Sequence, residues 1–510
     1  MVDPVNAPAA DTVPGILSWA ARQYPDVLAL VGPEGRHTFA ELDAEVRALA
    51  GRLAGIGIGH GSRVAVYLGN GVRWVVSALA VQCLGGVAVP VSTWARRDEL
   101  TRIRERVRPR LLITGDRVVG RDPTRVLAES GLSEAGPGFL GTAIWRDKLE
   151  LPGGGPADES RAPHQEDVAL ILSTSGSTSQ PKLVPLLHGD LLRNSQAIGD
   201  RQGLVPGDRL WFGAPLFFSY GCANALPVCL THGTALVLQE GLDGNEALAL
   251  IERERCTAYY GFGPTTRKLV EAPDFGNRDT SSLRTGTTGF TEAEKSLVRD
   301  TLGVPQVCSV YGMTEAYGHS AMTSWEDSDE TFLSTQGTVL PTQELRIVAP
   351  DTGVVLGPGE HGEIQLRGAV TPGYLGSDDG FTTDGWLRTG DIGELDTAGR
   401  LRFVERAKSM LKINGINVAP AEIEAVLLEH PRVEQAYVFG EYVDGTEQIV
   451  AAVVAEGETD GLVEELVRFI RERAASYKVP RRVVFIAAEE VPTTDTGKTN
   501  KRGLVELIRG

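Results

Sequence analysis

A hydroxyl-rich segment with one glycine and one lysine is the part of the sequence whose residue types most clearly suggest chemistry. It reads STSGSTSQPK over residues 173–182 and follows the apolar run VALIL. Hydroxyl groups, flexible backbone N–H groups and a cation are together the groups that bind the oxygens of a polyphosphate. The segment is not the GxxxxGK[ST] loop, because Lys182 lies six residues after Gly176 and no hydroxyl follows it. Taken alone, it is also compatible with a polar loop that binds no ligand.

Four further motifs follow in the same chain. They are YGMTE at 311–315, WLRTGD at 386–391, ERAKSMLKINGINVAPAEIE at 405–424 and PTTDTGKTNKRGL at 492–504. In this order the five strings resemble the adenylate-forming superfamily, which includes acyl-CoA synthetases, aryl-CoA ligases, firefly luciferase and the adenylation domains of peptide synthetases. The resemblance extends from about residue 15 to the C-terminus. Five motifs in register argue strongly against coincidence.

The resemblance implies an enzyme that joins a carboxylate to the α-phosphate of ATP, releases pyrophosphate and passes the acyl group to a thiol. It therefore implies ATP, Mg²⁺ and coenzyme A as cofactors. Tyr311 is expected to stack on adenine, Thr314 to touch the α-phosphate, and Glu315 to hold Mg²⁺ through a hard carboxylate oxygen. The residues implied for the β- and γ-phosphates are Thr174, Ser175, Gly176, Ser177, Thr178 and Lys182.

Two residues are implied at the ribose. Asp391 matches the aspartate that accepts both ribose hydroxyls, and Arg406 matches the arginine that approaches the same ribose and phosphate. Without the neighbouring motifs, RTGD could be an ordinary turn and Arg406 a surface cation. The register of the motifs favours the functional interpretation.

Three lysines are implied in the two half-reactions. Lys498 matches the lysine that bridges the substrate carboxylate and the α-phosphate, where a preorganised cation is worth a few kcal/mol. Lys408 occupies the hinge position, and Lys412, beside Gly415, belongs to the loop that serves thioester formation. In this family the C-terminal domain swings about the hinge between adenylation and thioester formation.

The acyl pocket is expected in PLFFSYGCANALP, residues 215–227, which resembles the LFFxYG segment of benzoate-type CoA ligases. Phe218, Tyr220 and Asn224 are the expected pocket wall, with Phe262 and Gly263 of YYGFGPT opposite. An apolar wall suits a hydrophobic acid, although the same aromatics could instead fill the core. Because the segment has no acidic residue to pair an amino group, an α-amino-acid substrate is disfavoured.

The sequence departs from the family pattern at three places. Ser179 stands where the phosphate loop usually has a second glycine, and Phe290 replaces a small residue beside the adenine and acyl sites. We expect activity to survive the first change and the pocket or the nucleotide slot to be reshaped by the second. The segment GYLGSDDGFTTDGW lacks the insertion of fatty-acyl-AMP ligases that do not use CoA, which favours CoA as the acceptor.

Composition excludes several other classes of protein. The 510 residues are 42% hydrophobic and carry a net charge of −17, and no dense Lys/Arg block is present, so a nucleic-acid partner is not expected. The apolar stretch 72–91 is interrupted by Arg73 and Pro90, so we expect a buried helix that runs into a strand and no membrane span. The N-terminus lacks the features of a signal peptide, and five scattered cysteines form no disulfide framework, so we predict a cytoplasmic location.

Local patterns predict an α/β fold. Strands are expected at 63–68 and 168–173, and helices at 41–53 and 246–251. From about 337 the pattern predicts a small β unit, and after 406 a helix that begins near Pro420, the strand AYVFG, a helix at 462–475 and the strand VVFI. We therefore predict an N-terminal AMP-binding domain over 1–406, with two α/β layers and a β subdomain, and a mobile α+β lid domain over 407–510, with the active site between them.

The resulting functional prediction is an acyl-CoA synthetase for an aromatic or bulky hydrophobic carboxylic acid. The main alternative changes the acceptor to the phosphopantetheine arm of an acyl carrier protein, as in natural-product loading. A nucleotide-binding protein that no longer catalyses is a second alternative, against which the intact Glu315, Asp391, Arg406 and Lys498 argue. A luciferase-like oxygenase is a third, but no residue specifies light emission.

Overall fold

The computed structural model describes residues 10–156, 158, 161–174, 181–289, 292–350, 352–377, 380–406, 411–413, 416–418, 420–443, 446–457, 459–492 and 501–509. They form two compact units, and the chain passes from the first to the second between residues 407 and 408. Two earlier segments, Trp94–Ile103 and Ser173–Lys182, group with the second unit. Among the described residues, no helix has the length and apolar content needed to cross a membrane.

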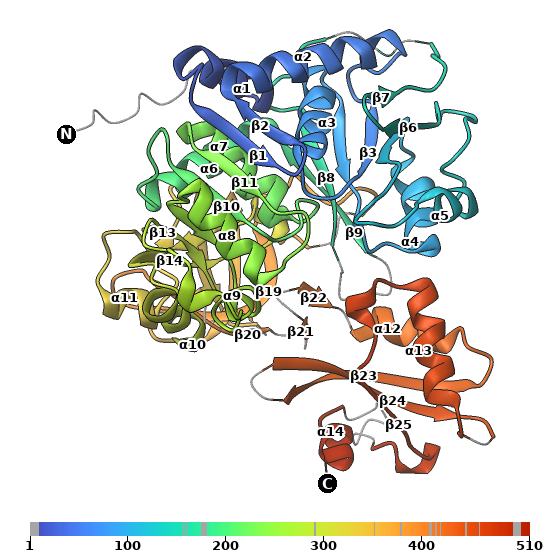
Figure 1. Ribbon diagram of the computed structural model, residues 1–510. Helices are drawn as coiled ribbons and strands as arrows, with labels where there is room; N and C mark the ends of the chain where they lie inside the picture. The colour runs from blue at the N-terminus through green and yellow to red at the C-terminus, as the bar shows by residue number, and fades with distance from the viewer. Residues whose placement is uncertain are drawn as a thin grey trace. The chain divides into compact units, whose positions relative to one another are not determined.

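The first layer of the first unit is a seven-stranded sheet in the order β7-β6-β5-β3-β4-β8-β9. Strands β3, β6, β7, β8 and β9 of this sheet are labelled in Figure 1. Its strands are β3 (Arg63–Tyr67), β4 (Val87–Pro90), β5 (Leu111–Gly115), β6 (Thr142–Trp145), β7 (Leu149–Glu150), β8 (Val168–Thr174) and β9 (Lys182–Leu187). Strands β3, β4, β5, β6 and β8 pair in parallel, and β4 and β5 are buried throughout. Nearly continuous apolar runs are typical of parallel strands covered on both faces. The strands predicted at 63–68 and 168–173 are confirmed.

The second layer is a nine-stranded sheet in the order β16-β15-β14-β13-β12-β10-β11-β1-β2. Its strands are β1 (Leu28–Gly32), β2 (Gly35–Thr38), β10 (Arg209–Phe212), β11 (Ala235–Leu238), β12 (Ala258–Tyr260), β13 (Thr285–Thr288), β14 (Gln306–Tyr311), β15 (Ala321–Met322) and β16 (Thr338–Val339). Strands β1 and β10 to β14 pair in parallel, and antiparallel strands close both edges. One hydrophobic core draws residues from both sheets and from several helices.

Helices accompany both sheets. The helices of the first unit are α1 (Val13–Gln23), α2 (Phe39–Gly55), α3 (Val72–Cys83), α5 (Thr124–Glu129), α6 (His188–Arg201), α7 (Leu226–His232), α8 (Gly244–Glu254), α9 (Gly263–Val270), α10 (Glu292–Ser296) and α11 (Asp329–Ser334). Short helical turns are η1 (Ile103–Val107), η2 (Gly221–Ala225), η3 (Phe275–Asn277), η4 (Leu297–Thr301) and η5 (Thr314–Ala316).

Two of these helices follow directly from local sequence. Helix α2 begins with a capping box, in which Thr38 and Glu41 each accept a hydrogen bond from the backbone N–H of the other. Helix α3 is apolar on nearly every side and buried, and β4 follows it, as predicted for 72–91. The predicted helices at 41–53 and 246–251 lie within α2 and α8.

The third layer of the first unit is an antiparallel sheet of four strands in the order β17-β18-β19-β20. The strands are β17 (Gln343–Val348), β18 (Gly362–Gly368), β19 (Leu387–Leu395) and β20 (Leu401–Arg406). They confirm the β unit predicted after residue 337. In the β19–β20 register, Asp391 lies opposite Arg406, so the two residues implied at the ribose are neighbours on adjacent strands.

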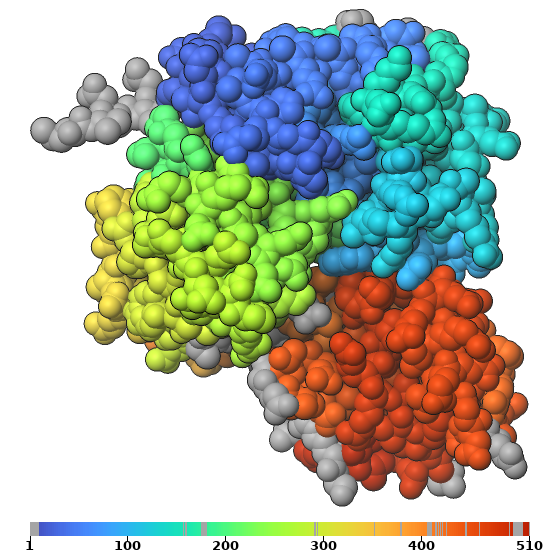
Figure 2. Space-filling model, in the orientation of Figure 1, coloured from blue at the N-terminus to red at the C-terminus, as the bar shows by residue number. Residues whose placement is uncertain are grey.

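The second unit is a compact α+β body, and its described residues after 410 are orange and red in Figure 2. Its elements are α4 (Arg97–Arg102), β21 (Leu411–Ile413), β22 (Ile416–Val418), α12 (Pro420–Leu428), β23 (Val433–Val443), β24 (Thr446–Ala455), α13 (Leu462–Arg473), η6 (Ser476–Lys478), β25 (Arg482–Phe485), η7 (Ala488–Glu490) and α14 (Lys501–Arg509). Strands β23, β24 and β25 form one sheet, and β21 pairs with β22. Pro420 is the first residue of α12, as predicted.

Candidate active site

The described ends of the hydroxyl-rich segment lie on neighbouring strands. Thr174 is the last residue of β8, and Lys182 is the first residue of β9, which is next to β8 in the sheet. Both side chains are half-buried. Ser175, Gly176, Ser177, Thr178 and Ser179 lie outside the described residues, so their contact with phosphates stays a prediction.

Tyr311 and Asp391 are brought together from two different sheets. The hydroxyl of Tyr311, at the end of β14, donates a hydrogen bond of 2.9 Å to Asp391 Oδ2 on β19. The Tyr311 ring stacks on Phe403 of β20, with ring centroids 5.9 Å apart. Both partners of the hydrogen bond are buried. Residues implied for adenine and for ribose are therefore in direct contact, while the side chain of Arg406 lies outside the described part of the chain.

Glu315 is held by a phenol from a distant segment. It lies in η5, directly after the strand that ends at Tyr311. Its Oε1 accepts a hydrogen bond of 2.9 Å from the hydroxyl of Tyr374, and both residues are buried. Burial and the neighbouring Glu315 carboxylate raise the pKa of the Tyr374 phenol well above its usual value, so this hydroxyl donates at neutral pH. The result is a carboxylate with a defined orientation.

Thr314 connects the nucleotide motif with the expected acyl segment. Its Oγ1 donates a hydrogen bond of 3.0 Å to Ser219 Oγ. Ser219 stands between Phe218 and Tyr220, two residues of the expected pocket wall. All four side chains are half-buried. The residue implied at the α-phosphate is thus next to the residues implied for the acid.

The expected acyl wall is an aromatic cluster. Tyr220 stacks on Tyr260 with ring centroids 5.1 Å apart and lies against Phe262 at 4.7 Å. The Tyr220 hydroxyl shares a hydrogen bond of 2.7 Å with Thr287 Oγ1. Gly263 follows Phe262 as the buried first residue of α9. Tyr220, Phe262 and Gly263 therefore lie close together, while their role as a pocket wall stays a prediction and Phe290 lies outside the described residues.

Asn224 and His319 add buried polar groups to this cluster. Asn224 lies in η2, one turn beyond Tyr220, and its side chain is completely buried. The His319 ring lies 5.9 Å from the Tyr220 ring, and burial lowers its pKa to about 4. His319 is not among the residues predicted from the sequence. The only signal for it is a histidine four residues after Glu315 in YGMTEAYGHS.

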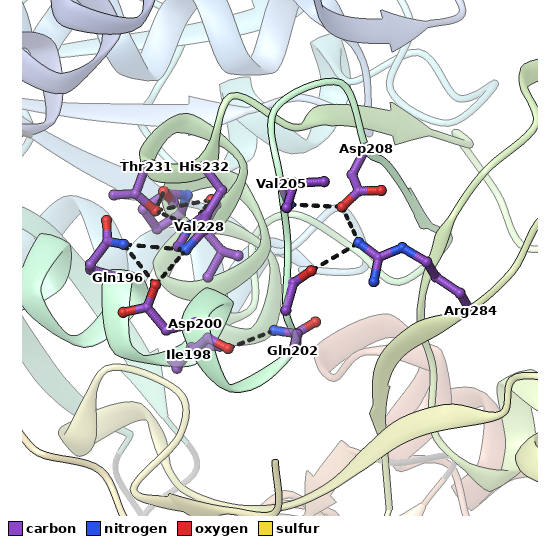
Figure 3. A network of polar contacts seen from close by, with 12 residues as sticks. Gln196, Ile198, Asp200, Gln202, Val205, Asp208, Val228, Thr231, His232 and Arg284 are labelled. Atoms are coloured by element: carbon purple, nitrogen blue, oxygen red, sulfur yellow. Dashed lines mark hydrogen bonds and ion pairs between the residues drawn. The ribbon is translucent and has the colours of Figure 1, made fainter. Parts of the chain in front are cut away.

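A polar network joins helices α6 and α7, the second of which directly follows the turn η2 that contains Asn224 (Figure 3). His232 of α7 contacts Asp200 of α6 at 3.2 Å, and Gln196 donates to the same Asp200 oxygen at 2.9 Å. At the end of α6, Arg284 donates to the backbone carbonyl of Gly203 at 2.9 Å and pairs with Asp208. Helices α6 and α7 are therefore locked to each other and to the second sheet, which positions the π-helical turn η2 immediately before α7.

In the second unit, only part of the predicted machinery is described. Lys412 lies in the two-stranded β21–β22 sheet, and its backbone N–H donates a hydrogen bond of 2.5 Å to Glu447 Oε2 on β24. Gly415, Lys408 and Lys498 lie outside the described residues, so the hinge and the adenylation lysine stay predictions.

Comparison with known proteins identifies the family. Residues 17–375 match the family described as AMP-binding enzyme, and residues 422–498 match the AMP-binding enzyme C-terminal domain. The chain belongs to this family, and the predicted large N-terminal and small C-terminal α/β architecture is confirmed.

Individual relatives define the class of enzyme. The chain is 32% identical to 3-[(3aS,4S,7aS)-7a-methyl-1,5-dioxo-octahydro-1H-inden-4-yl]propanoyl:CoA ligase of Mycobacterium tuberculosis, over 97% of this chain and 99% of the relative. A structure of o-succinylbenzoate CoA synthetase from Bacillus subtilis, bound with a product analogue, superposes with a TM-score of 0.81 at 26% identity and covers 96% of this chain and 98% of that one. The amide bond synthetase McbA from Marinactinospora thermotolerans also has a TM-score of 0.81, at 28% identity over 96% and 99% of the two chains. The predicted adenylate-forming superfamily and acid–thiol ligase class are confirmed.

Proposed function

We propose that this protein adenylates an aromatic or bulky hydrophobic carboxylic acid with ATP and transfers the acyl group to coenzyme A. The observation that carries the proposal is the hydrogen bond between Thr314 and Ser219. Acyl-AMP formation requires the substrate carboxylate to lie beside the α-phosphate, because positioning of the two reactants removes much of the entropic barrier. Thr314, the residue implied at the α-phosphate, contacts Ser219 in the acyl segment, and this contact supports the arrangement.

The nucleotide would be held by groups whose chemistry fits it. Asp391 would accept the ribose hydroxyls, and Lys182 with the preceding hydroxyls would bind the β- and γ-phosphates. Mg²⁺ commonly uses one or two protein carboxylates, while phosphates and water supply the remaining oxygens. Among the described residues no group of three or more His, Cys, Asp or Glu could hold a metal ion, so Glu315 would hold Mg²⁺ together with ATP. The ion would neutralise charge on the phosphates.

The acid is expected to be bulky and largely apolar. The half-buried rings of Tyr220 and Phe262 are packed against each other and offer a broad aromatic surface. The Mycobacterium tuberculosis relative is named for a bicyclic propanoyl group, and the Bacillus subtilis relative for a succinylbenzoate, which supports a large ring-containing acid.

The acceptor and the domain boundary complete the proposal. Coenzyme A is favoured because the two relatives just named are CoA ligases or synthetases. The acceptor of McbA is an amine according to its name, and an acyl carrier protein would present the same pantetheine thiol as CoA, so both are alternatives for the test.

We place the domain boundary at 406/407 and the hinge at Lys408.

The direct test is pyrophosphate release with ATP, Mg²⁺ and a panel of benzoates, cinnamates, medium- and long-chain fatty acids and bulky polycyclic acids, each with and without CoA. Faster turnover with CoA for a ring-containing acid supports the proposal. If acids are adenylated but CoA does not accelerate the reaction, the acyl acceptor would instead be a carrier protein or an amine. Pyrophosphate release by none of the acids, despite binding of ATP, would contradict it.

Replacement of Lys498 tests the assignment of the first half-reaction. We expect Lys498→Ala to lower acyl-AMP formation by about 10²- to 10³-fold, because a preorganised cation no longer stabilises the charge that builds between carboxylate and α-phosphate. Conversion of supplied acyl-AMP with CoA should remain near the wild-type rate. Lys501→Ala removes the same charge three residues further along and serves as the control. Equal loss of both steps in Lys498→Ala would argue against the assigned role.

A further inference from the structure

Two polar side chains beside the aromatic wall have buried atoms without hydrogen-bond partners. Both amide atoms of Asn224, Oδ1 and Nδ2, and the Nε2 atom of His319 are buried, and no group in the described part of the chain hydrogen-bonds to them. Asn224 is 0% exposed and His319 is 3% exposed. A buried polar group that lacks a partner typically costs about 1–3 kcal/mol, and native proteins retain few of them. Three such atoms in one neighbourhood therefore require an explanation.

The two residues are close neighbours at the acyl wall. A Cβ added to Gly318 would lie 2.9 Å from Asn224 Nδ2, so the amide packs against the residue that precedes His319. Gly318 has a φ of +98°, which favours glycine, and allows this close approach. Tyr220, whose ring lies 5.9 Å from the His319 ring, is one helical turn from Asn224.

His319 is fixed in place by its backbone. Its carbonyl accepts hydrogen bonds from Asn194 Nδ2 of α6 at 2.9 Å and from Gln343 Nε2 of β17 at 3.2 Å. A polar atom that is held rigidly and left without a partner is ready to bind a ligand group, because little ordering remains to be done.

The neutral ring and the amide determine which hydrogen bonds a ligand could make here. Burial lowers the pKa of His319 to about 4, so the ring is neutral at pH 7. In a neutral imidazole with the proton on Nδ1, the unpartnered Nε2 is an acceptor. The Asn224 amide offers a donor and a second acceptor. A hydroxyl, which both donates and accepts, matches these groups better than a purely accepting oxygen does.

We propose that Asn224 and His319 form a polar subsite that binds a hydroxyl group on the body of the acid, remote from the carboxylate that is activated. This inference rests on the proposed function, because it assigns the aromatic cluster around Tyr220 to the acid. It narrows the substrate class from hydrophobic acids to hydroxylated ring acids. In such a site the hydroxyl donates to His319 Nε2 and accepts from Asn224 Nδ2.

The test compares matched acids in the wild-type protein. Benzoates and cinnamates with hydrogen, hydroxyl or methoxy at each ring position are assayed by pyrophosphate release. We expect at least one hydroxy acid to exceed both its unsubstituted and its methoxy partner in kcat/KM by about tenfold or more, because a site built for a hydroxyl rejects acids that leave its polar groups unpaired. A wild-type protein that treats all three members alike at every position would overturn the inference.

Asn224→Leu should abolish this preference. The substitution keeps the approximate shape and removes the amide, so the ratio of kcat/KM for the hydroxy acid to kcat/KM for the unsubstituted acid should fall about tenfold. The melting temperature without ligand should stay the same or rise, because an unpaired buried group is removed. A lower melting temperature with equal loss for all acids would identify Asn224 as a structural residue, for example one bonded to a buried water.

Thr234→Val is the matched control. Thr234 is completely buried, its hydroxyl has no partner in the described part of the chain, and it lies between α7 and β11. Its replacement should leave the ratio of hydroxy to unsubstituted acid unchanged.

A binding measurement separates this inference from the proposed function. Calorimetry of the same acid sets, with a non-reactive ATP analogue present, does not depend on turnover. If no acid releases pyrophosphate but the hydroxy acid binds more tightly and loses that advantage in Asn224→Leu, the proposed activity fails and the subsite stands. If acids are activated without any hydroxyl preference, the activity stands and the subsite fails. If no member of any set binds, the subsite fails as well.

Discussion

Glu315 depends on a residue that no motif contains. The Tyr374 hydroxyl donates to its Oε1 at 2.9 Å from a segment 59 residues away. A hydrogen bond to a carboxylate is worth about 1.5–3 kcal/mol, and it fixes which oxygens face outward. If Glu315 holds Mg²⁺ with ATP, as proposed above, Tyr374 is a positioning residue for the metal.

The substitution Tyr374→Phe tests this role. We expect the Mg²⁺ concentration for half-maximal pyrophosphate release to rise about tenfold, because the carboxylate loses the donor that orients it. The stabilisation of the melting temperature by Mg²⁺ with ATP should require a similarly higher Mg²⁺ concentration, and this second readout does not depend on turnover.

Tyr317→Phe is the control for that variant. Tyr317 is also buried, and its hydroxyl accepts a hydrogen bond from the backbone N–H of Leu187 at 3.0 Å. We expect a loss of stability in this control but an unchanged Mg²⁺ requirement. If the Mg²⁺ requirement rose in both variants, loss of either tyrosine hydroxyl would have the same effect, and Tyr374 would have no specific role in positioning Glu315.

Functional residues inside a sequence motif could be predicted, whereas the residues that contact them from distant segments could not. Glu315 and Asp391 were identified because they stand at fixed offsets within YGMTE and RTGD. Tyr374 and His319 were not, because their importance arises from contacts formed only when distant segments fold together. A single sequence carries no signal for the distance between such residues.

At the scale of elements, the start of α6 is joined to α1 through a buried histidine. The backbone N–H of Val13 donates to His188 Nδ1 at 3.3 Å, and burial lowers the pKa of His188 to about 4. Above pH 6.5 the imidazole is neutral in the folded and the unfolded chain. As the pH falls from 6.5 to 4, the unfolded chain binds the proton first, so stability is lost in this window and changes no further below it.

Denaturation by urea at several pH values checks this prediction. The loss from His188 alone should approach about 3 kcal/mol between pH 6.5 and pH 4, since each pKa unit corresponds to about 1.4 kcal/mol. His188→Gln should unfold more easily at pH 7 but lose less stability on acidification than the wild type does. Carboxylates titrate in both proteins, so the difference between the two pH profiles isolates the histidine. Parallel profiles would contradict a neutral buried His188.

Helices and strands whose apolar residues follow one clear pattern could be predicted from the sequence, and those without such a pattern could not. The apolar repeat at 41–53 and the capping residues Thr38 and Glu41 specify α2, and the run before Pro90 specifies α3 and β4. Strand β24 is continuously apolar from Ile449 to Ala455, without the alternation of a half-buried strand, and α14 contains Gly503, so neither has a clear local signature. The π-helical turn η2, which carries Asn224, has no signature either, because its geometry comes from packing.

At the scale of the whole molecule, the residues predicted to bind the substrates and the lysines predicted for the two half-reactions lie in different units. The residues predicted to bind the nucleotide and the acid belong to the first unit, apart from the hydroxyl-rich segment, and Lys412 and Lys498, which are predicted to be catalytic, follow residue 407. This division agrees with an enzyme that uses one set of groups to activate the acid and exchanges one lysine-bearing segment for another before transfer.

Lys412→Ala should therefore impair only the second half-reaction. The local fold should persist, because the hydrogen bond to Glu447 comes from the backbone N–H of Lys412 and not from its side chain. We expect acyl-AMP formation within about twofold of wild type and thioester formation slower by about tenfold or more, the reverse of the pattern for Lys498→Ala. Single-turnover assays that follow pyrophosphate without CoA, and acyl-CoA from supplied acyl-AMP, measure the two steps separately. If Lys412→Ala and Lys498→Ala slowed the same step, the two lysines would serve one half-reaction, and the division of labour along the chain would be wrong.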